Sequence, residues 1–233
     1  MNRDLNAALP GWLPPPWPGP EVLDGRYTRL ERLKLAHAED LFAANSADDG
    51  IWDWLFYEPF QTLEEYRTWV AGAASKGESV YYVIRSETGQ WTGVASFMRI
   101  NPAAGSIEIG DICFSPALQR SRAATEALTL MIGWAFEAGY RRLEWKCNAL
   151  NLPSRRAAQR LGLSFEGVFR QAMIVKGRNR DTAWFAAIDA EWPQLKEAYA
   201  AWLDPGNFDA SGVQRTSLGN LTRPAIATVD PHQ

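Results

Sequence analysis

A polar turn near the middle of the chain contains residue types that bind phosphate groups. It consists of Gln119, Arg120, Ser121 and Arg122 and directly precedes the segment 122–138, whose apolar residues follow the helical period. The first N–H groups of a helix have no partner within the helix and lie at the positive end of its dipole, so they favour an anion. The two arginines add formal charge beside them. The turn therefore predicts a pyrophosphate site, although many surface helices also begin with arginine.

The sequence offers little for metal-dependent chemistry or for a serine–histidine pair. It contains 2 histidines, of which His37 lies in a polar stretch and His232 lies next to the C-terminus. No group of cysteines and histidines has zinc-ligand spacing. The 2 cysteines, Cys113 and Cys147, are too few for a disulfide framework and fit a reducing compartment. We therefore expect no metal and a cytoplasmic location.

Length and composition are those of an ordinary globular protein. The chain has 233 residues, 46% of them hydrophobic and 22% charged, with a formal net charge of -3. This slight acidity argues against a nucleic-acid partner. Residues 1–12 lack the apolar core of a signal peptide, and no stretch approaches the roughly 18 apolar residues that span a bilayer. We therefore expect neither a nucleic acid nor a membrane as partner.

Hydrophobic periodicity and turn residues predict strands that alternate with helices. Strands are expected at 27–33, 80–85, 91–100, 106–114, 142–147, 165–171 and 182–188. Helices are expected at 37–47, 62–75, 122–138, 151–162 and 191–203. The segment 51–60 forms an aromatic loop between the first two helices, and 176–181 forms a charged hairpin tip.

The order of elements from 106 to 147 places the polar turn at a ligand-binding position. A strand, a helix and a second strand imply a right-handed crossover between two parallel strands. The helix begins just beyond the carboxyl end of the strand 106–114, where open α/β sheets bind ligands. The topology and the polar turn therefore predict the same site.

In this order of elements the chain resembles the GNAT acetyltransferases. In that family the turn after the fourth strand carries a Gln/Arg-x-x-Gly-x-Gly/Ala pattern around the pyrophosphate of coenzyme A. This sequence matches the pattern at Gln119 and Ala124 but has Arg122 where glycine is usual. Glycine permits close backbone approach, so an arginine side chain there must swing outward, which on this hypothesis brings it to a phosphate.

A second group of motifs resembles the ribosomal-protein N-acetyltransferase branch of that family. Asn151 and Ser154, followed by 157–163, are similar to its N-x-x-S…A-x-x-L-G-F signature, with leucine at the last position. The segment 165–170 resembles F-x-x-E-G-x-x-R-x, and 108–111 resembles a fourth strand that contains E-I-G. The resemblance covers about 25–190.

The resemblance implies an α/β protein with the GNAT acyl-CoA acyltransferase fold. This fold has a mixed, twisted sheet that is splayed between its fourth and fifth strands, with helices on both faces. We divide the chain into a Pro/Trp-rich N-terminal arm (1–25), a GNAT acetyltransferase domain (26–203) and an irregular C-terminal tail (204–233). The arm should be extended and pack on the domain through its tryptophans, although a binding arm is the alternative.

The resemblance also implies acetyl-CoA as cosubstrate and roles for individual residues. Ser154 is expected to contact the departing sulfur, although it could instead cap its helix. Glu108 is the expected general base, with Asp111 in reserve and a solvated strand carboxylate as the alternative. Catalysis by Cys147 is not expected, because a lone thiol is more often a small core residue.

The remaining site residues fall into two groups. Residues expected to bind the coenzyme are Ile112, Cys113, Phe114, Gln119, Arg120, Ser121, Arg122, Ala123, Ala124, Asn151 and Arg156. Arg155 and Arg156 are both candidates for contact with the 3′-phosphate. Residues expected to line the acceptor pocket are Trp52, Trp54, Tyr57 and Asp111. Core packing of the aromatic residues and a solvated basic helix face are the alternatives.

The function expected from the sequence is acetyl transfer from acetyl-CoA to a primary amine by direct attack in a ternary complex. The acceptor is a protein N-terminus or a small-molecule amine, and the oligomeric state, including a homodimer, stays open. The alternative is a catalytically silent acyl-CoA-binding module.

Overall fold

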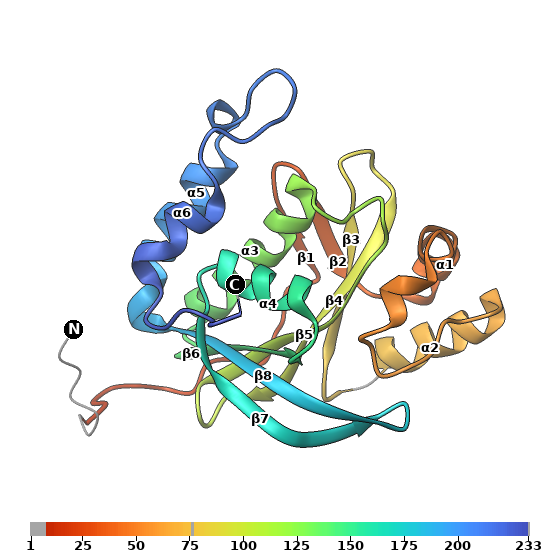
Figure 1. Cartoon of the computed structure of the whole chain (residues 1–233), viewed down its shortest axis with the longest axis horizontal. Helices are drawn as coiled ribbons and strands as arrows, with labels where there is room; N and C mark the ends of the chain where they lie inside the picture. Colours follow the sequence, from red (N-terminus) through yellow and green to blue (C-terminus); the bar gives the residue numbers. More distant parts are fainter. Residues whose placement is uncertain (1–7, 76, 233) are drawn as a thin grey trace.

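The computed structural model describes residues 8–75 and 77–232. These residues form one eight-stranded sheet with the strand order β1-β2-β3-β4-β5-β6-β8-β7 (Figure 1). The strands are β1 (Val22–Asp24), β2 (Arg29–Arg32), β3 (Val80–Arg85), β4 (Trp91–Asn101), β5 (Ser106–Phe114), β6 (Arg142–Asn148), β7 (Ser164–Val175) and β8 (Arg178–Ile188). The helices are α1 (Ala38–Asn45), α2 (Leu63–Ser75), α3 (Arg122–Glu137), α4 (Leu152–Arg160), α5 (Trp192–Leu203) and α6 (Leu218–Thr222).

Helices cover both faces of the sheet. α3, α4 and α5 share one hydrophobic cluster with the sheet, and α1 and α2 share a second cluster with its other face. In β3, Tyr82 and Ile84 belong to the first cluster, whereas Val83 between them belongs to the second. Figure 1 shows α1 and α2 on one side of the sheet and α3 to α6 on the other. The predicted α/β fold is confirmed.

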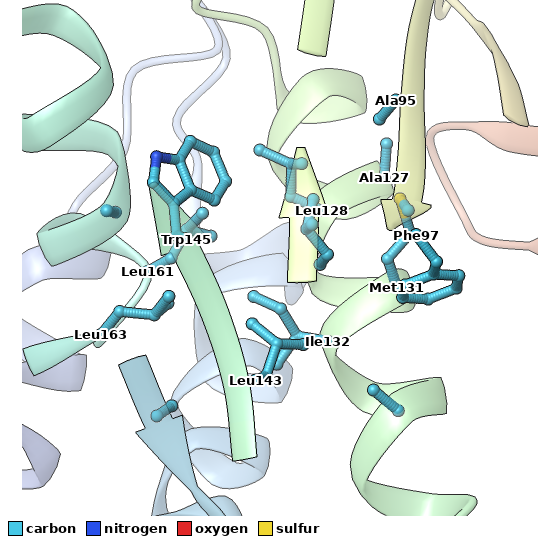
Figure 2. Close-up of a cluster of buried hydrophobic side chains, with 14 of the residues drawn as sticks. Ala95, Phe97, Ala127, Leu128, Met131, Ile132, Leu143, Trp145, Leu161 and Leu163 are labelled. Atoms are coloured by element: carbon cyan, nitrogen blue, oxygen red, sulfur yellow. The ribbon is translucent and has the colours of Figure 1, made fainter. Parts of the chain in front are cut away.

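α3 fills the space beside the centre of the sheet. Its buried face is apolar at the helical period, as the sequence predicts. Figure 2 shows Leu128 and Ile132 of α3 beside Leu143 and Trp145 of β6, and Met131 beside Phe97 of β4. The helix therefore packs against strands on both sides of the opening between β5 and β6.

The pairing of β5 with β6 ends early, which opens the sheet. These strands are the fourth and fifth of the predicted order, and they are parallel to one another. Their paired residues are Ser106 with Arg142, Ile107 with Leu143 and Glu108 with Glu144. Beyond Glu108 the two strands diverge, so the predicted splay between them is confirmed.

A β-bulge in β5 accompanies this divergence. Val94 of β4 pairs with Cys113, whereas Ser96 pairs with Gly110, so β5 contains one residue more than its partner. Asp111 lies in the bulge with φ 50°, in the left-handed region that few residues other than glycine adopt. The Ser96 hydroxyl donates to the carbonyl of Gly110 over 3.0 Å and supports the bulge. The bulge interrupts the alternation that a regular strand would have.

The predicted strands and helices are present, and the sheet differs from the prediction in two places, an additional strand β1 and a longer β7–β8 hairpin. β1 was not predicted, because its three residues follow a proline-rich stretch. The β7–β8 hairpin is longer than predicted, because Lys176 and Gly177 both have positive φ and form a tight turn. The strands therefore pair up to that turn, and Arg180 belongs to β8 rather than to a loop.

The first described residues lie extended along the domain. The carbonyl oxygens of Pro16 and Pro20 accept hydrogen bonds from the hydroxyls of Tyr140 and Tyr82, at 3.0 and 2.8 Å. Trp17 is 44% exposed. Residues 1–7 of the predicted arm lie outside the described residues, and the three-part division of the chain stays a prediction.

The C-terminal tail is more ordered than predicted. It contains the short helix α6, and Leu218 in that helix is fully buried. Asp230 is buried and receives both Nε and Nη2 of Arg155 on α4, the first over 2.7 Å. The tail also accepts a hydrogen bond from the backbone of Phe165 at Thr228. The expectation that Arg155 reaches a phosphate is therefore wrong, because its guanidinium is engaged inside the protein.

Replacement of Asp230 by alanine should strongly destabilise the fold. The change leaves a buried guanidinium without its carboxylate, which typically costs about 3–5 kcal/mol of unfolding free energy. Chemical denaturation of the parent and of Asp230→Ala measures this loss. The double variant Arg155→Met/Asp230→Leu should recover most of it, because it removes both charges. A loss below about 1 kcal/mol in Asp230→Ala would contradict a stabilising ion pair.

Candidate active site

A continuous groove follows the opening between β5 and β6. It consists of three adjoining cavities of about 750, 400 and 130 Å³. The first two share Phe114, Gln119 and Pro153 among their lining residues, and the last two share Ile112, Asn151 and Ser154. The groove thus runs from the N-terminus of α3, between the strands, to an end lined by Asp111 and Arg180.

The wide end of the groove lies at the N-terminus of α3. Ser121 is the N-cap, and its hydroxyl accepts from the N–H of Ala124 over 2.9 Å. The N–H of Thr125 bonds to the carbonyl of Ser121, so the N–H groups of Arg122 and Ala123 have no acceptor within the helix. Arg120 precedes them with φ 58°. N–H groups without a helical acceptor are the donors that an anion site requires, and the anion site itself stays a prediction.

The side chain of Arg122 is engaged within the protein. Its guanidinium donates to Glu87 over 2.8 Å and lies 4.5 Å from the ring centre of Tyr27 and 5.0 Å from that of Phe208. The hydrogen bonds to Glu87 raise the pKa of Arg122. The predicted swing of this side chain onto a phosphate is not observed, because a carboxylate and two rings already hold it. Arg120 and Arg156 line the same cavity and are both exposed.

Asn151 and Ser154 lie where the middle cavity meets the narrow one. Asn151 is the N-cap of α4, and its side-chain oxygen accepts from the N–H of Ser154 over 3.1 Å. The Ser154 hydroxyl does not cap the helix; it accepts from the indole N–H of Trp145 over 3.0 Å. Because one oxygen lone pair is used in this way, the hydroxyl hydrogen remains able to donate. Helix capping, one of the two roles that the sequence left open for Ser154, is therefore carried out by Asn151 instead.

Asp111 lines the narrow end, and two tyrosines hold its carboxylate. Tyr57 donates to one carboxylate oxygen over 2.9 Å and Tyr81 to the other over 2.6 Å. Burial, with the charge of Asp111, raises the pKa of Tyr57 well above its ordinary value, so this tyrosine stays protonated and continues to donate. A carboxylate oxygen has two lone-pair sites, so Asp111 can still accept a hydrogen bond from a ligand.

Glu108, the predicted base, lies outside the lining of these cavities. It is 2% exposed and receives Arg99 on one oxygen and Lys146, over 2.6 Å, on the other. Lys146 also pairs with Glu144 over 2.6 Å. Both carboxylate oxygens of Glu108 are therefore engaged by cations within the protein.

The same fold occurs in solved acetyltransferase structures. A GCN5-related N-acetyltransferase from Brucella melitensis is 45% identical, with a TM-score of 0.90 over 92% of this chain and 100% of that chain. A GNAT-family acetyltransferase from Chromobacterium violaceum is 40% identical, with a TM-score of 0.76 over 80% of this chain and 96% of that chain. RimL, a ribosomal L7/L12 alpha-N-protein acetyltransferase in complex with coenzyme A, is 23% identical, with a TM-score of 0.63 over 72% and 98% of the two chains, and shows the fold alone.

A family model of the acetyltransferase (GNAT) domain matches residues 28–164, more than half of the chain. The chain belongs to the GNAT acetyltransferase family. It is therefore an acetyl-CoA-dependent N-acetyltransferase, as the sequence motifs predict. None of the curated proteins matches the chain significantly.

The aromatic loop of this acetyltransferase divides between the core and the groove. Trp52 is 4% exposed and packs on the rings of Tyr57 and Phe60, and neither Trp52 nor Tyr57 lines the three cavities. Trp54 lines the groove as predicted, and Phe56 joins it at the narrow end. The prediction that Trp52 and Tyr57 line the pocket is therefore wrong, because their rings fill the cluster beneath the loop.

Both thiols of the acetyltransferase are buried. Cys113 packs in the cluster formed with α1 and α2 and, unlike its neighbours Ile112 and Phe114, does not line the three cavities. Cys147 lines the narrow cavity, and burial raises the pKa of its thiol to about 11. A thiol with this pKa is protonated at neutral pH, which agrees with the expectation that Cys147 is not a nucleophile.

Among the described residues, no helix is long and apolar enough to cross a membrane. Within the same residues, no group of three or more histidine, cysteine, aspartate or glutamate side chains is arranged to hold a metal ion.

Two arginines of the turn should differ in their contribution to coenzyme affinity. Arg120→Ala should weaken acetyl-CoA binding about tenfold, because it removes an exposed cation from the wide end of the groove. Arg122→Ala should stay within about twofold, because its guanidinium is paired with Glu87. Calorimetric titration measures both. A tenfold loss in Arg122→Ala with no change in Arg120→Ala would reverse the assignment.

Proposed function

We propose that this enzyme acetylates a primary amine held at the narrow end of the groove, by direct attack in a ternary complex. The supporting observation is the continuity of the groove, which joins an anion-binding helix terminus to a cavity that contains a carboxylate. Bound acetyl-CoA supplies an activated thioester. The amine nitrogen bonds to the acetyl carbon, and the carbon–sulfur bond breaks.

The groove has the features needed to hold acetyl-CoA. The free N–H groups at the start of α3 and the cations Arg120 and Arg156 suit the phosphates. Between the ends, the backbone of β5 from Ile112 to Phe114 has no partner in β6, so its polar groups can bond to the amides of pantetheine. Gln119 also lines this space, and its side-chain amide donates to the carbonyl of Phe114 over 2.9 Å, so that carbonyl is already engaged.

In this proposal Asp111 receives the proton of the attacking amine and Ser154 assists the sulfur. Asp111 lies on the bulge, lines the narrow cavity and retains free lone pairs. The Ser154 hydroxyl can donate to the sulfur as the bond breaks, because Trp145 fixes its oxygen from the other side. Asn151 keeps its amide N–H groups for the thioester oxygen or pantetheine, since its oxygen is used as the N-cap.

Glu108 has a positioning role in this proposal. It holds Arg99 on β4 and Lys146 on β6, and so ties the strands on both sides of β5 at the last pair before the opening. Lys146 also lines the narrow cavity. In this proposal the proton acceptor is therefore Asp111, the reserve candidate three residues further along the strand, and not Glu108.

The size of the narrow cavity favours a small amine over a protein N-terminus as acceptor. The cavity is about 130 Å³ and is lined by Trp54, Leu55 and Phe56 of the aromatic loop. The tip of the β7–β8 hairpin holds this loop in place, because Lys176 donates to the carbonyl of Trp52 over 2.8 Å. A silent binding module is disfavoured, because a carboxylate and a serine hydroxyl both lie where a thioester would end.

Ser154→Ala should lower turnover on the order of 10²-fold while the Michaelis constant for acetyl-CoA changes little. The hydroxyl acts mainly while the sulfur departs, so its loss affects the transition state more than coenzyme binding. Steady-state kinetics measure both constants. Ser164→Ala is the control, because it removes a buried serine hydroxyl that accepts from the backbone N–H of Ala227 and lies outside the groove. Normal turnover in Ser154→Ala would remove this serine from the mechanism.

Asp111→Asn and Glu108→Gln should have opposite effects. Asp111→Asn should lower turnover by about 10²–10⁴-fold with acetyl-CoA affinity retained, because an amide cannot take the proton. Glu108→Gln should retain most of the turnover and lose stability, because it leaves Arg99 and Lys146 without their shared carboxylate. Kinetics with one common amine and thermal unfolding measure the two effects. The reverse pattern would make Glu108 the base.

A further inference from the structure

Arg180 on β8 is a buried cation at the narrow end of the groove. It is 6% exposed and lines the same 130 Å³ cavity as Asp111. Its guanidinium carbon lies 4.8 Å from the ring centre of Phe56, another residue of that cavity. Its Nε is buried and has no hydrogen-bond partner within the described chain.

The other buried charged side chains that the structure describes are compensated. Glu108 has Arg99 and Lys146, and Arg155 has Asp230. Glu126 accepts from the backbone N–H groups of residues 26, 27 and 28. Arg180 differs from these residues, because its contacts are an aromatic ring and more distant charges. Burial lowers its pKa, and the nearby charge of Arg99 lowers it further.

An unpaired buried cation is unfavourable unless a ligand supplies the missing anion. Residues 8–75 and 77–232 place no carboxylate in hydrogen-bond contact with Arg180. The phosphates of the coenzyme belong to the other end of the groove, because the wide cavity and the narrow one share no lining residue. The anion therefore has to enter with the acceptor.

We propose that the acceptor is a small amine that also carries an anionic group, as an α-amino acid does, and that Arg180 binds that group. This inference rests on the acetyl transfer proposed above and identifies its substrate class. A guanidinium presents several N–H donors in one plane, which match the two oxygens of a carboxylate or phosphate. With the anion on Arg180, the amine of the same molecule lies in a cavity that Asp111 also lines.

The two ends of such a molecule match the charges of the narrow cavity. Asp111 attracts the cationic acceptor, which loses one proton to solvent to become a neutral amine, and Asp111 then takes the proton released on attack. Arg180 is complementary to the anion. Phe56 holds the guanidinium through its ring face and leaves the N–H edges in the plane for a ligand. The aromatic walls then surround the remaining part of the acceptor.

The test compares amines that differ only in the anion. The twenty amino acids are assayed against their amides, O-phosphoethanolamine against ethanolamine, and a peptide with an acidic second residue against its neutral counterpart, each with acetyl-CoA. In the parent, kcat/KM for a preferred small anionic amine should exceed that for its neutral counterpart by about 10- to 100-fold. Arg180→Met should abolish this preference, so that kcat/KM for the anionic amine falls to about that for its neutral counterpart.

Control variants separate recognition from folding. Arg178→Met removes an exposed cation from the same strand and should keep the preference. Arg180→Lys should retain part of it, because the charge stays while the planar donors are lost. Calorimetric binding of acetyl-CoA and thermal unfolding check that Arg180→Met is folded and has an intact coenzyme site.

Three results would overturn the inference. They are equal rates with anionic and neutral amines in the parent, an unchanged preference in Arg180→Met, or a preference confined to the peptide. If acetyl-CoA binds but no amine is acetylated, the proposed transfer fails instead. The amino acids and amides are then titrated into the coenzyme A complex, where equal affinity of the parent and Arg180→Met for the acids would also exclude the anion site.

Discussion

The early end of pairing between β5 and β6 is the constraint on which the site depends. After Glu108 the two parallel strands no longer pair, and the bulge at Asp111 lies in the unpaired part of β5. An empty gap of this kind would cost the sheet packing contacts and would leave backbone groups without hydrogen bonds. Here α3 packs against both sides of the gap, and what remains is the groove. The same bulge that ends the regular strand brings a carboxylate to the lining of that groove.

The walls of the groove come from segments that are far apart in the chain. The aromatic loop is held by Lys176 at the tip of the β7–β8 hairpin, and α4 is held by Asp230 of the tail through Arg155. These contacts keep Trp54, Ser154 and Arg180 near one another. The charges of the scaffold ion pairs are neutralised by each other, whereas no described residue forms an ion pair with Arg180. This difference distinguishes charge that stabilises the fold from charge that can bind a ligand.

Several features of the site could be predicted from the sequence because they depend on local patterns. Ser121 and Asn151 begin helices, and their positions follow from capping residues before apolar periodicity. The roles of Arg122 and Arg155 could not be predicted, because their partners Glu87 and Asp230 are distant in sequence. The resemblance made Glu108 the expected base, whereas the tertiary structure places Asp111 in the lining of the groove, at a bulge that breaks the regular alternation of β5. Arg180 belongs to a charged segment that has the pattern of an exposed hairpin tip.

The sequence by itself determined the order of the predicted strands and helices, the crossover at α3, the polar turn that begins this helix and, through its motifs, the acetyltransferase family. Periodicity, capping residues and motif spacing are properties of neighbouring residues, so they are visible without the fold. Only the tertiary structure decided which cations are neutralised internally, and which aromatic residues and which carboxylate line the groove. These depend on distances between segments separated by tens of residues, and electrostatic and packing interactions act only over such short distances in space.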